Sequence, residues 1–86
     1  MPKFDSLDEF WSAYYSLEWI FMETKKAAIV DYLVESRNCV NGLSDGWHEF
    51  RARLLNMEKM WGSQLTGDTG KIFNDIKNEV DLWLNR

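Results

Sequence analysis

The fold depends on residues 7–37, LDEFWSAYYSLEWIFMETKKAAIVDYLVESR. This stretch contains no Gly, Pro or Asn, which are residues that often end a helix. Just before it, Ser6 is followed three positions later by Glu9, a capping pattern that predicts a helix start at Leu7. Most of its apolar side chains keep one helical phase. The residues of this stripe are Phe10, Trp11, Tyr14, Tyr15, Leu17, Phe21, Met22, Ala28, Ile29, Tyr32 and Leu33.

The polar segment Glu23–Lys26 interrupts the apolar pattern of this stretch. One interpretation is that the helix breaks there, with Thr24 as the cap of a new helix. The alternative is one continuous helix over 7–37. We favour the continuous helix, because two independent helices have no reason to share one phase.

Two further helices follow, over 45–62 and 69–85. Asn41 and Gly42 suit a connector before the first of them, and the segment 62–70 contains three glycines, as loops do. Residues spaced four and three apart form the seam of the helix over 45–62, namely Leu43, Trp47, Phe50, Leu54, Met57 and Trp61. The last helix has its apolar face at Ile72, Phe73, Ile76, Val80, Trp83 and Leu84.

The predicted fold is therefore a single all-α domain over 1–86, a bundle of three helices with a long first helix. It has four helices if the first breaks near Thr24. With 86 residues the chain has room for one core, and 45% hydrophobic residues with five Trp are enough to build it.

Charge and composition limit the partners that we expect. The net charge is -4 and the pI is about 4.8, which gives no electrostatic footprint for nucleic acid. The longest apolar runs, Trp19–Met22 and Ala27–Val30, have four residues, so we expect neither a signal peptide nor a membrane span. One cysteine, Cys39, predicts a reducing compartment, and we expect a cytoplasmic protein.

No set of residues predicts catalysis. The segment Gly67–Lys71 has glycines and a lysine before a helix, as phosphate loops do, but Asp68 stands where the motif needs Lys. His48 is the only imidazole and we expect it to be exposed, while Cys39 is expected as a small buried apolar residue. We therefore expect no catalytic residues, no metal, no cofactor and no enzyme.

Two charged residues, Glu18 and Lys25, project near the centre of the apolar stripe of residues 7–37. One interpretation is that both side chains reach to the rim or form ion pairs. The other is that they form the polar floor of a pocket for a small ligand. The residues of this candidate pocket are Tyr14, Glu18, Phe21, Met22, Lys25 and Tyr32.

A second apolar face lies on the same stretch, away from the main stripe. Its residues are Trp19, Ile20, Ala27, Val30 and Val34. A continuous helix over 7–37 is about 46 Å long, whereas a globule of this size is about 30 Å across. Because the other two helices cannot cover such a helix, we predict an antiparallel homodimer centred on this second face.

The function that these patterns favour is a non-catalytic module that binds itself and a protein partner. The first alternative is a small-molecule-binding protein that uses the pocket at Glu18 and Lys25. The second is an acidic inhibitor, or decoy, of a nucleic-acid-binding partner, which rests on the net charge of -4 alone.

Overall fold

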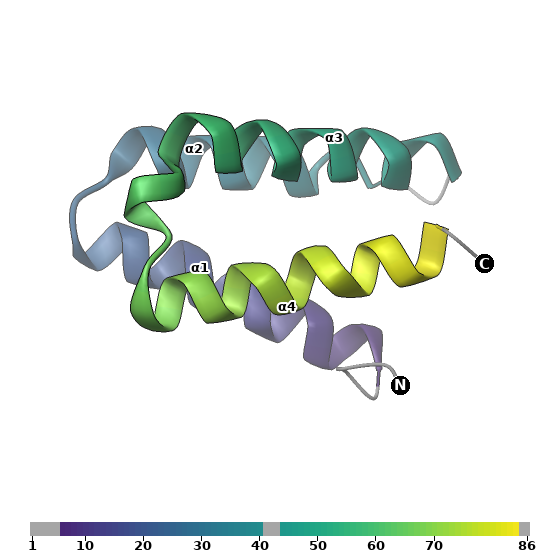
Figure 1. The fold of residues 1–86 in the computed structure, drawn as a ribbon, viewed down its shortest axis with the longest axis horizontal. Helices are drawn as coiled ribbons and strands as arrows, with labels where there is room; N and C mark the ends of the chain where they lie inside the picture. The colour runs from purple at the N-terminus through teal and green to yellow at the C-terminus, as the bar shows by residue number, and fades with distance from the viewer. Residues whose placement is uncertain (1–5, 41–43, 85–86) are drawn as a thin grey trace.

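The computed structural model describes residues 6–40 and 44–84 and shows a bundle of four α-helices (Figure 1). No strand occurs in these two ranges, so the predicted all-α class is confirmed. In chain order the elements are α1 (Leu7–Glu23), α2 (Ala27–Arg37), α3 (Ser44–Trp61), the short 3-10 helix η1 (Gly62–Gln64) and α4 (Gly67–Leu84).

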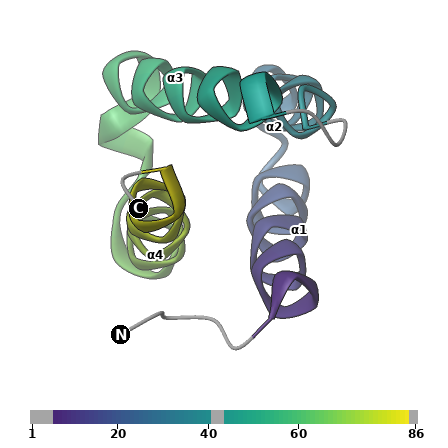
Figure 2. The same ribbon diagram turned by 90° about the vertical axis from the view of Figure 1, so that its right-hand side faces the viewer.

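The four helices stand at the corners of a square when the bundle is viewed end-on (Figure 2). Each helix packs against the two that adjoin it around the square: α1 on α2 and α4, and α3 on α2 and α4. The molecule measures 35 Å along its longest axis. A continuous helix of about 46 Å would be longer than the molecule.

The predicted long helix is wrong, and the structure has the alternative break near Thr24. Thr24, however, ends α1 as its C-cap instead of starting the next helix, whose N-cap is Lys26. The Lys25 N–H donates to the Met22 carbonyl at 3.1 Å, and the Lys26 N–H donates to the Phe21 carbonyl at 2.9 Å. These two bonds form a Schellman motif, which ends a helix with one residue in the left-handed region. Lys25 occupies that position with φ 61°. The sequence did not indicate this end because glycine, its usual residue, is absent.

The shared phase of the apolar stripe has a local explanation. The turn at 24–26 has about as many residues as one helical turn, so the register of apolar positions is kept while the chain reverses. The core side of the two helices contains Phe10, Tyr14, Leu17, Phe21, Ile29 and Leu33. The predicted stripe was too wide, because Tyr15, Met22 and Ala28 are exposed.

Helix α1 begins as predicted, since Ser6 is its N-cap and the Ser6 hydroxyl accepts from the Glu9 N–H at 3.2 Å. On α3 and α4 the predicted faces enter the core through Phe50, Leu54, Met57, Phe73, Ile76 and Val80. Trp47 and Trp61 are half-buried beside them, and Leu43 lies outside the described residues.

One end of the core is aromatic. The Phe10 ring lies 5.0 Å from the rings of Trp11 and Trp83, 5.9 Å from Trp47 and 6.3 Å from Phe50, centroid to centroid. These rings come from α1, α3 and α4, so this cluster joins three helices. Among the helices of the described ranges, none is both long and apolar enough to cross a membrane.

Candidate interaction surface

The outer flank of α1 carries three large apolar side chains in water. Tyr15, Trp19 and Met22 are 50%, 60% and 55% exposed. They are four and three positions apart, so they lie on one side of the helix, one above the other. Three large apolar side chains exposed together on one side of a helix make this flank a candidate interaction surface.

One flank of α2 carries the half-buried Val30 and Val34 and the exposed Ala27, since Val30 lies three positions after Ala27 and four before Val34. Val30 also packs against the core. Arg37, three positions after Val34, contacts α1 from this flank, which shows that the flank faces α1. We call the joint surface of Tyr15, Trp19, Met22, Val30 and Val34 the α1–α2 outer face.

Helices α1 and α2 are fixed to one another by polar bonds at one end of this face. The Arg37 Nε donates to the Glu18 Oε2 at 2.8 Å, and the Arg37 guanidinium lies 5.3 Å from the centroid of the Tyr15 ring. Beneath this pair, the buried Tyr14 hydroxyl donates to the Leu33 carbonyl at 2.6 Å. These contacts hold the exposed Tyr15 ring in a defined place.

A shallow pocket opens at the same end of the α1–α2 outer face. It is lined by Trp11, Tyr15, Arg37 and Val40 and has a volume of about 210 Å³. Two aromatic rings, one aliphatic side chain and one guanidinium suit an apolar or polarisable side chain.

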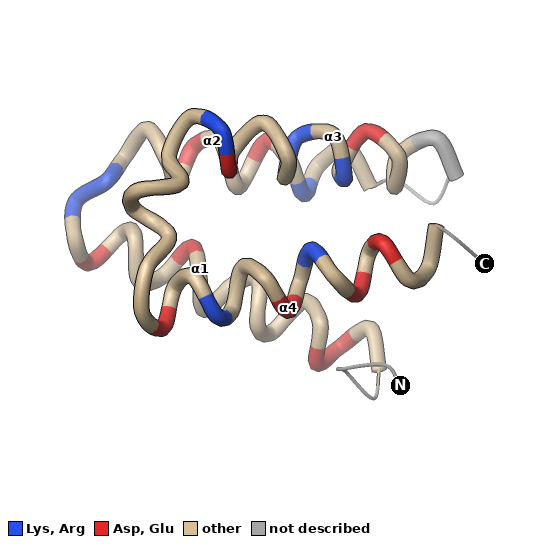
Figure 3. Tube along the Cα trace, in the orientation of Figure 1, with Lys and Arg blue, Asp and Glu red and all other residues tan. Residues whose placement is uncertain are grey.

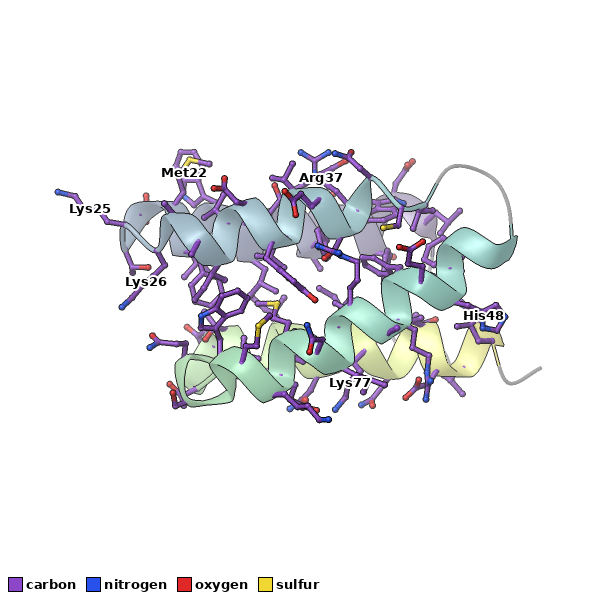
Figure 4. The ribbon with its side chains drawn as sticks, turned by 90° about the horizontal axis from the view of Figure 1, so that it is seen from above. Met22, Lys25, Lys26, Arg37, His48 and Lys77 are labelled. Carbon is purple, nitrogen blue, oxygen red and sulfur yellow. The ribbon has the colours of Figure 1, made fainter. Side chains whose placement is uncertain are left out.

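Charges of opposite sign stand at the two ends of α1. Asp8 lies in the first turn of α1, and Lys25 lies in the turn after it; both are exposed and neither belongs to the ion pairs found within residues 6–40 and 44–84. Figure 3 shows acidic residues at the start of α1, near the N-terminus, and basic residues in the turn between α1 and α2 at the opposite end, where Figure 4 labels Lys25 and Lys26. Figure 4 shows Met22 and Arg37 along one edge of the α1–α2 pair, with Lys25 beyond the end of the helices.

Most residues of the predicted second apolar face belong to this surface. Trp19, Val30 and Val34 belong to the α1–α2 outer face, and Ala27 is exposed on the same flank of α2 as the two valines. Ile20 is the exception: it follows Trp19 directly, so it is turned by about 100° to the other flank of α1, where it is half-buried. Because the chain turns near Thr24, the residues of the predicted face are divided between α1 and α2, two helices that pack against each other.

The residues of the predicted pocket are not gathered around one cavity. Tyr14, Glu18 and Phe21 are buried, whereas Met22 and Lys25 are exposed. Glu18 is paired with Arg37 rather than with Lys25, so of the two interpretations of these charges an ion pair across helices holds for Glu18.

Tyr32, the sixth residue of the predicted pocket, lies between α2 and α3. Its hydroxyl donates to the Arg53 carbonyl at 3.2 Å, and the Arg53 guanidinium lies 4.4 Å from the centroid of its ring. The Arg53 Nε donates in turn to the Ser36 Oγ at 2.9 Å. These bonds join the two helices and leave Tyr32 no part in a cavity with Glu18.

The other residues singled out from the sequence do not form a site. His48 is exposed, as expected. Cys39 is half-buried, and burial followed by the nearby Glu49 carboxylate raises the pKa of its thiol, which favours the less reactive protonated form. The segment Gly67–Lys71 forms the first turn of α4. Within the described part of the chain, no three His, Cys, Asp or Glu side chains are grouped to hold a metal ion.

Tyr15 and Met22 are the surface residues that the sequence interpretation misplaced, because it assigned both to the core. The sequence contained a signal for them. Intervals of four, three, four and three positions separate the consecutive residues Asp8, Ser12, Tyr15, Trp19 and Met22. This spacing of alternately four and three marks a narrow contact seam along a helix.

Comparison of the chain with protein-family models, with curated proteins and with solved structures finds no match. The α1–α2 outer face is therefore interpreted from its own geometry.

Proposed function

We propose that this protein is a non-catalytic interaction module of the cytoplasm that binds another protein chain through the α1–α2 outer face. The observation that carries the proposal is the exposure of Tyr15, Trp19 and Met22 in one row beside Val30 and Val34. Leaving apolar surface in water costs about 25 cal/mol per Å². A partner that covers these side chains removes that cost, and aromatic side chains are the usual centres of such contacts.

The alternatives from the sequence have less support. The pocket at Trp11 and Arg37 has about 210 Å³, below the range of about 300–1,000 Å³ typical of small-molecule sites, so it suits one side chain of a partner. Acidic and basic residues are interspersed along α3 and α4 in Figure 3, which does not favour an acidic decoy of a nucleic-acid-binding protein.

Photo-crosslinking tests the proposal. Benzoylphenylalanine replaces Trp19 in one preparation and Leu82 of α4 in a matched one, since Leu82 is also an exposed apolar residue. We expect adducts at position 19, to a second copy or to another protein in a host extract, that an excess of unmodified protein prevents. Absence of adducts at position 19 above the level at position 82 would contradict the proposal.

A further inference from the structure

We infer that the occupant of the α1–α2 outer face is a second copy of this chain, docked with its α1 antiparallel to the first. The inference rests on the proposed function, because it names the partner of the same surface. It does not depend on the long helix that the sequence suggested. Instead, it depends on how the charges and the pocket are placed along α1.

The charges are arranged for self-pairing. Asp8 and Lys25 stand at the two ends of the row formed by Tyr15, Trp19 and Met22, and both are exposed. When two copies of α1 lie antiparallel, Asp8 of each copy meets Lys25 of the other. A parallel arrangement would place Asp8 against Asp8 and Lys25 against Lys25, which like charges oppose.

The shapes agree with the same arrangement. Asp8 and Lys25 are centred on a point between Ser16 and Leu17, and Trp11 and Met22 are centred on the same point. An antiparallel two-fold pair centred there places the exposed Met22 of one copy at the pocket lined by Trp11, Tyr15 and Arg37 of the other. A flexible thioether packs well on aromatic rings. Tyr15 and Trp19, on either side of the midpoint, then meet each other across the two-fold axis.

The backbone at Lys25 gives a further reason. Its φ of 61° is a conformation in which a side chain is unfavourable and glycine is not. Backbone strain of this kind is often found at functional positions, and the side chain that lysine adds over glycine here is a methylene chain that ends in an ammonium group. In the dimer this group meets Asp8 of the other copy.

Sedimentation equilibrium of the purified protein and its charge-reversal variants tests the inference. We expect the unmodified protein to be a dimer at micromolar concentration. Asp8→Lys and Lys25→Glu each place like charges at both contacts and should weaken the dimer about tenfold. The double variant restores opposite charges and should return to within about threefold of the unmodified protein.

Matched controls lie on the opposite side of the bundle. Asp68→Lys reverses an exposed aspartate in the first turn of α4, and Lys71→Glu reverses an exposed lysine in the same helix. Both should leave the dimer within about twofold of the unmodified protein. Trp19→Ala removes the central ring and should weaken the dimer about thirtyfold or more, with the helical circular dichroism of all variants retained.

Three results would overturn the inference. The first is an unmodified protein that stays monomeric at high micromolar concentration; if position 19 still crosslinks to another protein, the proposed function stands and only the second copy is excluded. The second is a dimer that Asp8→Lys and Lys25→Glu leave unchanged, which excludes the antiparallel arrangement. The third is a double variant that is weaker than either single variant.

Discussion

Among the ion pairs given for the described residues, two join α3 to α4, whereas one joins α1 to α2, where exposed apolar side chains surround it. Arg51 bonds Asp81, and Lys77 bonds Glu58 at 2.9 Å, with all four side chains partly exposed. On the other pair, Arg37 bonds Glu18, whose side chain is only 9% exposed. Charged groups at the surface are well solvated in water, whereas the exposed apolar row at Trp19 leaves apolar surface hydrated at a cost in free energy.

Exposed apolar residues exist on the α3–α4 pair too, but they do not form a row. Leu55 and Met60 are five positions apart on α3, which places them on different sides of the helix. Single exposed apolar residues of this kind are normal on a monomer. The difference between the two helix pairs therefore lies in the spacing of the exposed apolar residues along the helix more than in their number.

The largest effect should come from the aromatic end, where the two pairs meet. Phe10→Ala removes a fully buried ring that contacts Trp11, Trp47, Phe50 and Trp83, and should lower the free energy of unfolding by about 3–5 kcal/mol. Thermal unfolding followed by circular dichroism measures it. Because the ring joins α1 to α3 and α4, we expect one transition at a lower temperature; two separate transitions would show that the pairs fold independently.

The ion pair between α1 and α2 should contribute more to the free energy of unfolding than an ion pair between α3 and α4. Glu18→Ala leaves Arg37 half-buried without its carboxylate and should lower the free energy of unfolding by about 1.5–3 kcal/mol. Asp81→Ala breaks a partly exposed pair and should lower it by at most about 1 kcal/mol. Urea denaturation of both variants measures the two values. Equal losses would show that the greater burial of Glu18 does not make its ion pair with Arg37 contribute more to stability than the pair of Asp81 with Arg51.

The next effect concerns the bond between Tyr14 and the Leu33 carbonyl. Tyr14→Phe leaves this carbonyl without its donor and should lower the free energy of unfolding by about 1–2 kcal/mol at neutral pH. Chemical denaturation at pH 7 measures this loss, and Tyr15→Phe, on the exposed neighbour, is the control.

The same variant should change the dependence of stability on pH. Burial, followed by the nearby Glu18 carboxylate, raises the pKa of Tyr14 above its usual range. Above pH about 10 the unfolded chain loses this proton while the folded protein keeps it, so this residue alone lowers stability by up to about 1.4 kcal/mol per pH unit. Tyr14→Phe should therefore give a flatter fall in stability between neutral and strongly alkaline pH. An unchanged slope would contradict the assignment.

The smallest effect compares two turns with the same backbone angle. Lys25 and Gly67 both have a φ of 61°. Lys25→Gly relieves the strain and should raise the free energy of unfolding of the monomer by about 1 kcal/mol. Gly67→Ala should lower it by about 1 kcal/mol, since no atom lies near the added Cβ and only the backbone strain is introduced. Lys25→Ala is the control, because it keeps a Cβ and should leave stability near its starting value.

The sequence was sufficient for the class of the fold and for most of the core. Ser6 and Glu9 marked the start of α1, and the seams of α3 and α4 were read from apolar spacing, because both signals lie within a few residues of one another. The end of α1 could not be read in this way. It depends on a lysine in a left-handed conformation, which tertiary packing tolerates and local preference opposes.

The candidate surface was anticipated only in part. Trp19, Val30 and Val34 were assigned to one face from helical angle alone; in the structure Trp19 is exposed on α1, and Val30 and Val34 are half-buried on α2. Tyr15 was assigned to the core because it sits next to Tyr14, and a helical pattern cannot separate the edge of a buried stripe from the flank beside it. The partner of Glu18 was missed because Arg37 is 19 residues away, a contact that only the turn at Lys25 creates.

The placement of the tryptophans gives this protein two separate optical signals. The rings of Trp11, Trp47 and Trp83 are in contact, with centroids 5.9 Å and 5.3 Å apart, so their electronic transitions couple and contribute a near-ultraviolet circular dichroism signal that depends on the folded core. Trp19 takes part in none of the ring contacts given for residues 6–40 and 44–84, and it is 60% exposed. Its fluorescence emission should shift to shorter wavelength when the surface around it is covered, while the signal of the core stays constant.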